Sequence, residues 1–237
     1  MEFDNKRFNN QNNKGSVKSK TELAATHWLN LKTLLTVDRK LKARSDDVGP
    51  TYYGISKYTT SGWLNIPYEQ VLGARAISRI TVNPNNDNEV YASSFFSGLL
   101  KIQNDVPTVL YNQDNSGLES ISFLGPNYKD VRVNGAVFDK SGNLWMNNSL
   151  VPNGLKELKS NGQWQSYSLD GILDKSINAS MGRMIIDKNN TKWWCTDTDG
   201  IIAFNENGNV FKKITLGSNS GNLPFTDARA LAIDNRN

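Results

Sequence analysis

Apolar residues recur along this chain in one short pattern with a period of about 45 residues. The pattern is a Gly followed by an aliphatic residue and, four positions after the Gly, by another apolar residue. It begins at Gly54, Gly98, Gly154 and Gly200, which are spaced 44, 56 and 46 residues apart. Each copy is short and is bounded by polar, turn-forming residues, which is typical of a β-strand and not of a helix. The Gly permits a backbone conformation or a close approach that a β-carbon would forbid.

A second pattern keeps the same period. Asp139, Asp187 and Asp234 each close an apolar run and lie 48 and 47 residues apart. Trp145 and Trp193 each fall six residues after the Asp of their repeat. The Lys-Ser-Gly-Asn or Lys-Asn-Asn-Thr that follows the Asp predicts a tight hairpin, in which the Asp accepts hydrogen bonds from backbone amides two residues on.

Together the two patterns predict strand, turn, strand, turn and strand in each repeat, with a fourth apolar stretch after a further Gly turn. Four strands in about 45 residues is typical of a β-propeller blade. We therefore predict an all-β fold, an incomplete arc of a β-propeller with about three full blades and partial ones beside them. The two Trp residues fall in second strands, so we interpret them as core between blades and not as a ligand platform.

The predicted layout assigns residues 1–45 to an irregular basic segment and 46–237 to the partial propeller. The blades are expected as two closing strands in 54–67, whole blades at 74–112, 131–169 and 181–216, and the first strand of a truncated blade in 226–237.

The basic character of the chain comes from its N-terminal segment. Residues 1–45 contain ten Lys or Arg and four Asp or Glu, and the whole chain has a net charge of +4. Residues 21–45 fit an amphipathic helix, but they equally fit diverged strands of a preceding blade. We expect no signal peptide in the first residues, no transmembrane segment and no nucleic-acid partner.

The candidate chemistry is sparse. Cys195 is the single cysteine and His27 the single histidine, which excludes an internal disulfide, a cysteine metal cluster and a histidine-rich metal site. The run Thr196–Gly200 resembles a calcium loop, but it lacks the first acidic ligand and the closing Glu, so a hairpin turn is the preferred interpretation. We predict no catalytic residue, no metal and no cofactor.

Function is expected on the face built from connections between blades and from turns between second and third strands. These loops are rich in Asn, Ser, Gly and aromatic residues, which suits glycan or peptide recognition, although simple solvated connections fit the composition as well. The ligand-binding candidates are Phe95, Phe96, Asn147, Asn148, Asn153, Asp197 and Asp199.

The repeats resemble the two-component-regulator propeller repeat. Stretches such as GISKYTTSGWLNIPYEQVLG, VNPNNDNEVYASSFFSGLLKI and FDKSGNLWMNNS are also similar to the PorZ-like propeller family of the type IX secretion system, over residues 52–237. The resemblance implies a non-enzymatic scaffold in the periplasm or at the outer-membrane surface. It also implies binding of anionic lipopolysaccharide or another surface glycan, and partners among the sortase and outer-membrane secretion-complex proteins.

Two alternatives stay open. One is a glycan-sensing periplasmic propeller domain of a hybrid two-component sensor, and the other is a propeller lyase or glycosidase. The resemblance carries no ligand residues over to this chain.

Overall fold

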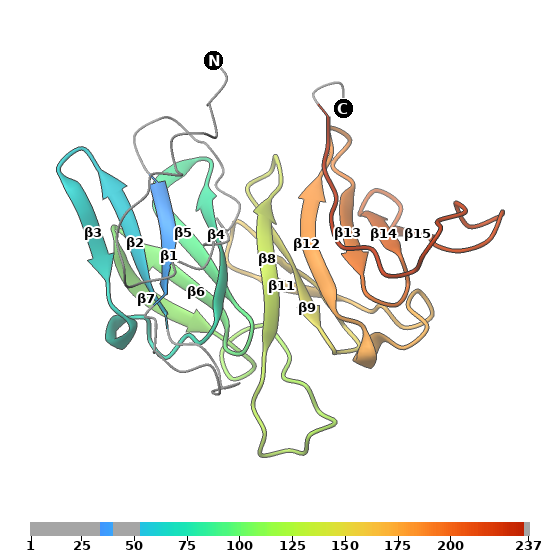
Figure 1. Ribbon diagram of the computed structural model, residues 1–237, viewed down its shortest axis with the longest axis horizontal. Coiled ribbons are helices and arrows are strands. Elements are labelled where there is room, and N and C mark those ends of the chain that lie inside the picture. Colours follow the sequence, from blue (N-terminus) through green and yellow to red (C-terminus); the bar gives the residue numbers. More distant parts are fainter. Residues whose placement is uncertain (1–33, 40–52, 235–237) are drawn as a thin grey trace, which may run out of the picture.

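The computed structural model describes residues 34–39 and 53–234, and these residues form an all-β structure without an α-helix. Four antiparallel sheets follow one another along the chain and are arranged side by side in an open arc (Figure 1). Within each sheet the strands pair in sequence order. The predicted fold class, an incomplete β-propeller, is confirmed.

Three sheets have four strands each, and they match the three predicted whole blades. Their strands are β4 (Ile77–Asn83), β5 (Asn86–Ser94), β6 (Gly98–Gln103) and β7 (Val106–Tyr111); β8 (Arg132–Phe138), β9 (Leu144–Ser149), β10 (Leu155–Leu158) and β11 (Trp164–Tyr167); and β12 (Met181–Ile186), β13 (Lys192–Thr196), β14 (Ile201–Asn205) and β15 (Val210–Ile214). In the described part of the chain, the 3-10 turns η2 (Tyr68–Gln70) and η3 (Ser176–Asn178) lie in connections between sheets.

The first sheet has three strands, β1 (Leu34–Arg39), β2 (Tyr53–Thr59) and β3 (Gly62–Ile66). β2 and β3 are the two closing strands that the sequence predicts. β1 pairs antiparallel with β2, from Leu34 opposite Tyr58 to Arg39 opposite Tyr53. Residues 21–45 were compatible with a helix or with strands, and the six residues of β1 adopt the strand. The rest of that segment lies outside the described residues. The domain boundary at residue 45 stays a prediction.

The strand predicted within residues 226–237 is not formed in the described part, 226–234. An isolated strand gains no ladder hydrogen bonds, and this segment makes only single backbone contacts, such as Ala228 N to Thr196 O at 3.0 Å. That prediction was wrong for 226–234, because an apolar sequence pattern does not supply a pairing partner.

The repeated Gly begins the third strand as predicted. Gly98 and Gly200 have φ angles of 93° and 84°. A β-carbon at either residue would meet a carbonyl oxygen at the end of the fourth strand, that of Tyr111 or Ile214. Only Gly allows the third strand to start this close to the fourth.

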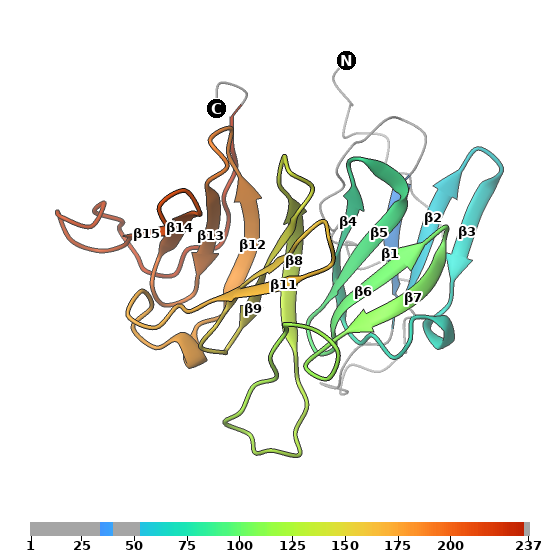
Figure 2. The ribbon, with the colours of Figure 1, turned by 180° about the vertical axis from the view of Figure 1, so that it is seen from behind.

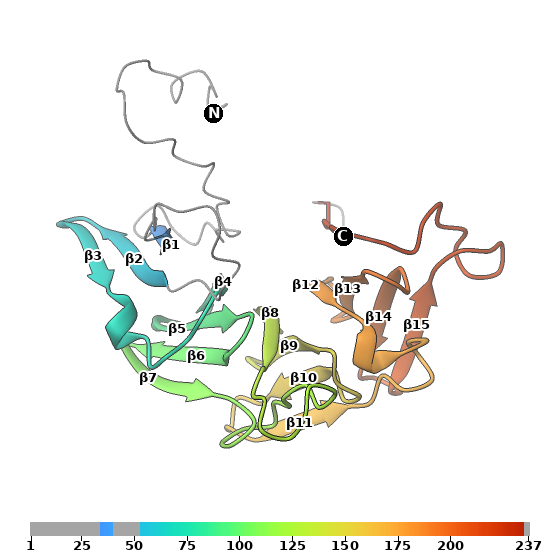
Figure 3. The same cartoon turned by 60° about the horizontal axis from the view of Figure 1, so that its bottom comes forward.

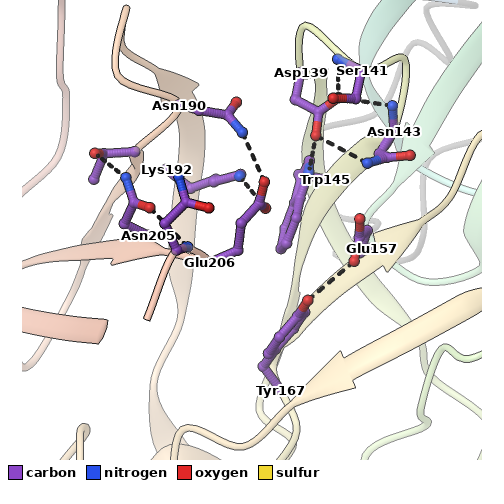
Figure 4. A network of polar contacts seen from close by, with 12 residues as sticks. Asp139, Ser141, Asn143, Trp145, Glu157, Tyr167, Asn190, Lys192, Asn205 and Glu206 are labelled. Atoms are coloured by element: carbon purple, nitrogen blue, oxygen red, sulfur yellow. Dashed lines mark hydrogen bonds and ion pairs between the residues drawn. The ribbon is translucent and has the colours of Figure 1, made fainter. Parts of the chain in front are cut away.

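The Asp and Trp of each repeat are joined by a hydrogen bond that the sequence analysis missed. Trp145 Nε1 donates to Asp139 Oδ2 at 2.9 Å, and Trp193 Nε1 donates to Asp187 Oδ2 at 2.9 Å. The other carboxylate oxygen accepts the amide two residues on, at 2.9 Å in both repeats, as predicted for the hairpin. Figure 4 shows this arrangement around Asp139. We call this arrangement the Asp–Trp clasp.

Trp145 lies in the core between the third and fourth sheets. It is fully buried, stacks on Tyr167 at 5.5 Å and contacts Phe204 of β14 at 5.9 Å between ring centroids. Lys192 Nζ lies 4.0 Å from the centre of the Trp145 ring and 2.5 Å from Glu206 Oε2 (Figure 4). The cation of Lys192, itself fully buried, is thus held between an aromatic face and a carboxylate.

Trp193 has a different environment. It is partly exposed, while its neighbour Trp194 is fully buried in the core with the third sheet. Because side chains alternate along a strand, Trp193 lies on the opposite face of the fourth sheet. The prediction of an interblade core residue therefore holds for Trp145 and fails for Trp193 in the described residues.

A separate apolar cluster fills each gap between successive sheets, three in all among the described residues. In Figure 3 the first strands β4, β8 and β12 line the concave side of the arc, and the fourth strands β7, β11 and β15 lie on its convex side. Every described blade therefore presents its first strand to the inside and its turns to the two edges.

The two tryptophans provide a matched pair for a stability test. We expect Trp145→Ala to lower the free energy of unfolding by about 3 to 5 kcal/mol, because it leaves a large cavity and uncovers Lys192. Trp193→Ala removes the same clasp bond but little buried surface, so its cost is expected to be less than half as large. Urea denaturation followed by tryptophan fluorescence measures both, and equal losses would contradict the assignment of Trp145 to the core.

Candidate functional site

The turns between second and third strands and the connections between blades lie at one edge of the arc, which we call the loop face. The connection from β7 to β8, residues 112–131, projects furthest there, at the bottom of Figures 1 and 2. It is anchored by Lys156, fully buried on β10, whose Nζ lies 2.5 Å from Glu119 Oε1 and 3.0 Å from Ser166 Oγ.

The turn between β5 and β6 positions Phe95 and Phe96 on this face. Ser94 Oγ accepts the amide of Ser97 at 2.8 Å and donates to the carbonyl of Arg75 at 2.5 Å. The hydroxyl therefore closes the turn and ties it to the connection before β4. The two rings, with centroids 5.4 Å apart at 84°, are both partly exposed.

Two arginines pack on these rings, Arg75 from the connection before β4 and Arg132 from the start of β8. The Arg132 guanidinium lies 5.2 Å from the centre of the Phe95 ring and 5.6 Å from that of Phe96, and Arg75 lies 5.8 Å from Phe96. These distances are within the range of cation–π attraction. We call these four residues the arginine–phenylalanine cluster.

The two arginines differ in how their charge is balanced. Arg132 Nε and Nη2 donate to Asp130 Oδ2 at 3.1 and 2.9 Å, and the side chain of Asp130 is buried. Arg75 donates only to neutral oxygens, Ser97 Oγ at 3.4 Å and the carbonyl of Phe96 at 3.3 Å, and no ion pair joins it to a carboxylate in 34–39 or 53–234. Its positive charge is therefore available to an anion from solution.

This arrangement suits one kind of ligand. An arginine can bind a carboxylate or phosphate through paired hydrogen bonds, and an adjacent aromatic ring can cover the apolar face of a sugar. No acid–base pair or nucleophile is part of the cluster, so it is equipped for binding.

The predicted Asn candidates are placed differently. Asn147 and Asn148 are fully buried at the end of β9. Asn147 Nδ2 donates to the carbonyl of Gly182 at 3.0 Å, and Asn148 Oδ1 accepts the amide of Glu119 at 2.7 Å. Both side chains hold neighbouring segments together, whereas Asn153 is partly exposed in the turn before β10.

The predicted acidic candidates are held in the turn between β13 and β14. Asp197 Oδ1 accepts the amide of Ser180 at 2.9 Å. Asp199 Oδ1 accepts the amide of Asp174 at 2.9 Å and Lys213 Nζ at 2.9 Å, and the residue is buried. The turn interpretation accounts for these bonds, and no three His, Cys, Asp or Glu residues come together as a metal site within the described chain.

These bonds shift the acidity of the groups that make them. Burial raises the pKa of Asp199, but the hydrogen bonds from Asp174, Lys213 and Thr198 outweigh it and hold that pKa below its usual value. Burial lowers the pKa of Lys213, but Asp174 and Asp199 outweigh it and raise that pKa. Asp199 is thus a fixed carboxylate at neutral pH, and it is already satisfied.

Sequence reasoning identified Phe95 and Phe96 but missed Arg75 and Arg132. Neither arginine is part of a repeat motif. In the sequence, Arg75 lies 20 residues before Phe95, and Arg132 lies 36 residues after Phe96. Both arginines reach the rings of Phe95 and Phe96 only because the connection before β4, the turn between β5 and β6 and the start of β8 lie at the same edge of the arc.

Asp199 predicts a pH-dependent contribution to stability. Because its pKa in the folded state is depressed, this contribution is present above the unfolded pKa of about 3.9 and is lost as the pH falls through the folded value. We expect Asp199→Asn to lower the free energy of unfolding at neutral pH by about 1 to 3 kcal/mol, and the difference from the unsubstituted protein to shrink in acid. Urea denaturation between pH 2 and 7 tests this.

Asp227→Asn, which removes an exposed partner of Arg229, is the control with little expected effect. A difference that does not change with pH would contradict the assignment.

No family model matches the sequence, and no curated protein matches it. Among solved structures, the fold is similar to PorZ, an essential bacterial surface component of the type IX secretion system of Porphyromonas gingivalis, with a TM-score of 0.63 and 18% identity over 79% of this chain and 26% of that one. It is also similar to the extracellular domain of a B. thetaiotaomicron protein assigned to the hybrid two-component systems (TM-score 0.55, 15% identity, 75% and 22% coverage). A third similar structure is virginiamycin B lyase from Staphylococcus aureus (TM-score 0.50, 14% identity, 81% and 62% coverage).

The chain spans about a quarter of the length of PorZ and less than two thirds of each of these proteins. The predicted resemblance to the PorZ-like propellers is confirmed at the level of the fold.

Proposed function

We propose that this chain is a non-catalytic binding scaffold that acts outside the cytoplasm and holds an anionic surface glycan on its loop face. The observation that carries the proposal is Arg75, a partly buried cation that packs on Phe96 and has no carboxylate partner in the described chain. A carboxylate or phosphate of the glycan pairs with Arg75, and its sugar ring packs against the phenylalanines.

The titratable groups favour binding over catalysis. Asp197 and Asp199 already accept hydrogen bonds from the protein, and Cys195 is buried, with a pKa that burial raises. A thiol with a raised pKa is a poor nucleophile at neutral pH. His27 lies outside the described residues.

The finer part of the proposal comes from the resemblance to PorZ. We propose that the glycan is anionic lipopolysaccharide, and that the propeller presents it to a sortase together with outer-membrane secretion-complex proteins, in the periplasm or at the outer-membrane surface. PorZ is a surface component and the B. thetaiotaomicron domain is extracellular, which supports the location. No described helix has the length and apolar character needed to cross a membrane.

Binding to purified lipopolysaccharide tests the proposal. We expect the full chain to bind lipopolysaccharide that carries an anionic polysaccharide more tightly than lipopolysaccharide that carries a neutral one. The affinity should fall as the salt concentration rises. Arg75→Gln removes a charged hydrogen-bond donor and should weaken binding by roughly tenfold, and Phe96→Ala by a similar factor.

The control is Arg229→Gln, since Arg229 is exposed and pairs with Asp227 at 2.6 Å, far along the chain from the cluster. It loses the same charge and should leave the affinity unchanged. Equal affinity for anionic and neutral lipopolysaccharide, or equal losses in Arg75→Gln and Arg229→Gln, would sink the proposal.

A further inference from the structure

The connection from β7 to β8 ends in a short segment that stands apart from the sheets. Ile121 N donates to the carbonyl of Asp130 at 3.0 Å, and Ser120 Oγ accepts the amide of Asp130 at 2.9 Å. These bonds close the loop, and residues 122–129, which we call the projecting tip, lie beyond them. Figures 1 and 2 show this connection extending past the other loops at its edge of the arc.

The base of the projecting tip is buried and well held. Ile121 is buried in a small apolar cluster with Leu150 and Val151 of the turn after β9. Asp130, at the other side of the base, is fully buried and accepts two hydrogen bonds from Arg132. The blade therefore fixes the place from which the tip extends.

The tip itself exposes apolar side chains. Phe123 and Leu124, each 53% exposed, are the central residues of a turn in which Gly125 N donates to the carbonyl of Ser122 at 3.1 Å. A β-carbon at Gly125 would meet no atom within 4 Å, so the turn stands in open space. Two adjacent apolar side chains held in water at the end of a projecting loop favour a partner that covers them.

The polarity of the tip changes in steps along the chain. Residues 120–128 carry no charge. After the apolar turn comes the exposed Tyr128, and then Lys129, whose Nζ pairs with Asp114 Oδ2 at 2.8 Å. A lipid bilayer has the same order: apolar side chains enter the acyl chains, Tyr prefers the interface, and charged groups stay at the headgroups or in water.

The size of the apolar surface also favours lipid over a protein partner. A stable protein interface buries about 800 Å² on each partner. An aromatic side chain buries roughly 150–250 Å² in all, and Phe123 and Leu124 are already half covered, so they supply less than half of that area. A bilayer needs no complementary shape and accepts a narrow tip of this kind.

We propose that the projecting tip inserts Phe123 and Leu124 into the acyl layer of a phospholipid bilayer, with Tyr128 at the interface. Two side chains give weak and reversible binding, since even a single myristoyl chain binds a membrane only marginally. The tip therefore turns the loop face toward the lipid surface without anchoring the protein there. This inference does not depend on the glycan proposed for the arginine–phenylalanine cluster.

Sedimentation of the full chain with phosphatidylcholine vesicles in large excess tests the proposal. Neutral lipid is chosen because residues 1–45 contain ten Lys or Arg and four Asp or Glu and would draw the chain to an anionic vesicle. We expect a bound fraction that rises with lipid concentration. It should persist in about 1 M salt, where charge interactions are screened beyond about 3 Å.

The double variant Phe123→Ser, Leu124→Ser should lower the vesicle partition coefficient at least roughly tenfold, because it removes the apolar surface that enters the lipid. Both residues are exposed, so the variant should unfold at the same urea concentration as the unsubstituted protein. The control is Trp63→Ser, which removes a side chain that is 55% exposed beside the turn between β2 and β3. That turn lies at the opposite edge of the arc (Figure 1), so this variant should bind vesicles normally.

A fluorescent label reports which part of the chain meets the lipid. The native Cys195 is buried, so an environment-sensitive dye can be directed to Leu124→Cys. We expect its emission to shift to the blue and to rise when vesicles are added. The same dye on Ser61→Cys, in the exposed turn between β2 and β3, should show no such change.

Four results would each overturn the proposal: no binding to phosphatidylcholine vesicles, unchanged binding in the double Ser variant, an equal loss in Trp63→Ser, or no spectral change at residue 124. The first of these would favour a protein partner for the tip. Phosphatidylcholine carries no glycan, and the variants leave Arg75 and Phe96 in place. The lipid contact and the proposed glycan site can therefore fail independently.

Discussion

The arc depends on the burial of apolar side chains between successive sheets. Trp145 shows how this is achieved: its indole nitrogen is satisfied within its own blade by Asp139, while its faces are covered by Tyr167 and by Lys192 and Phe204 of the next sheet. A buried N–H and a buried cation are both costly unless partnered. Because both have partners here, Trp145 and Lys192 can be buried between the two sheets.

The same geometry determines where binding groups stand. With the cores between the sheets, each first strand is left on the concave side and each turn at an edge. Arg75, Phe96 and Arg132 meet at the loop face because the connection before β4, the turn between β5 and β6 and the start of β8 lie together there. The arginine–phenylalanine cluster is built from residues of two blades, so it does not exist within a single repeat.

The features that could be predicted from the sequence are those that repeat within one blade. The Gly before each third strand and the Asp after each first strand have strict local geometry, and they placed the three whole blades correctly. Contacts between blades have no such local signal. The contact of Arg132 with Phe95 and Phe96 and the burial of Asn147 depend on which blades adjoin. Trp145 and Trp193 occupy equivalent positions, yet only Trp145 has a described sheet packed over it.

The Asp–Trp clasp also bears on how such a chain folds. Each clasp closes over six residues, from Asp139 to Trp145 and from Asp187 to Trp193, and needs nothing from a neighbouring blade. Contacts this close in sequence form quickly, because little chain entropy is lost in closing the loop. Each first hairpin can therefore form before its neighbour is in place, and a chain emerging from the ribosome can add its blades in order, each one docking on an already ordered surface.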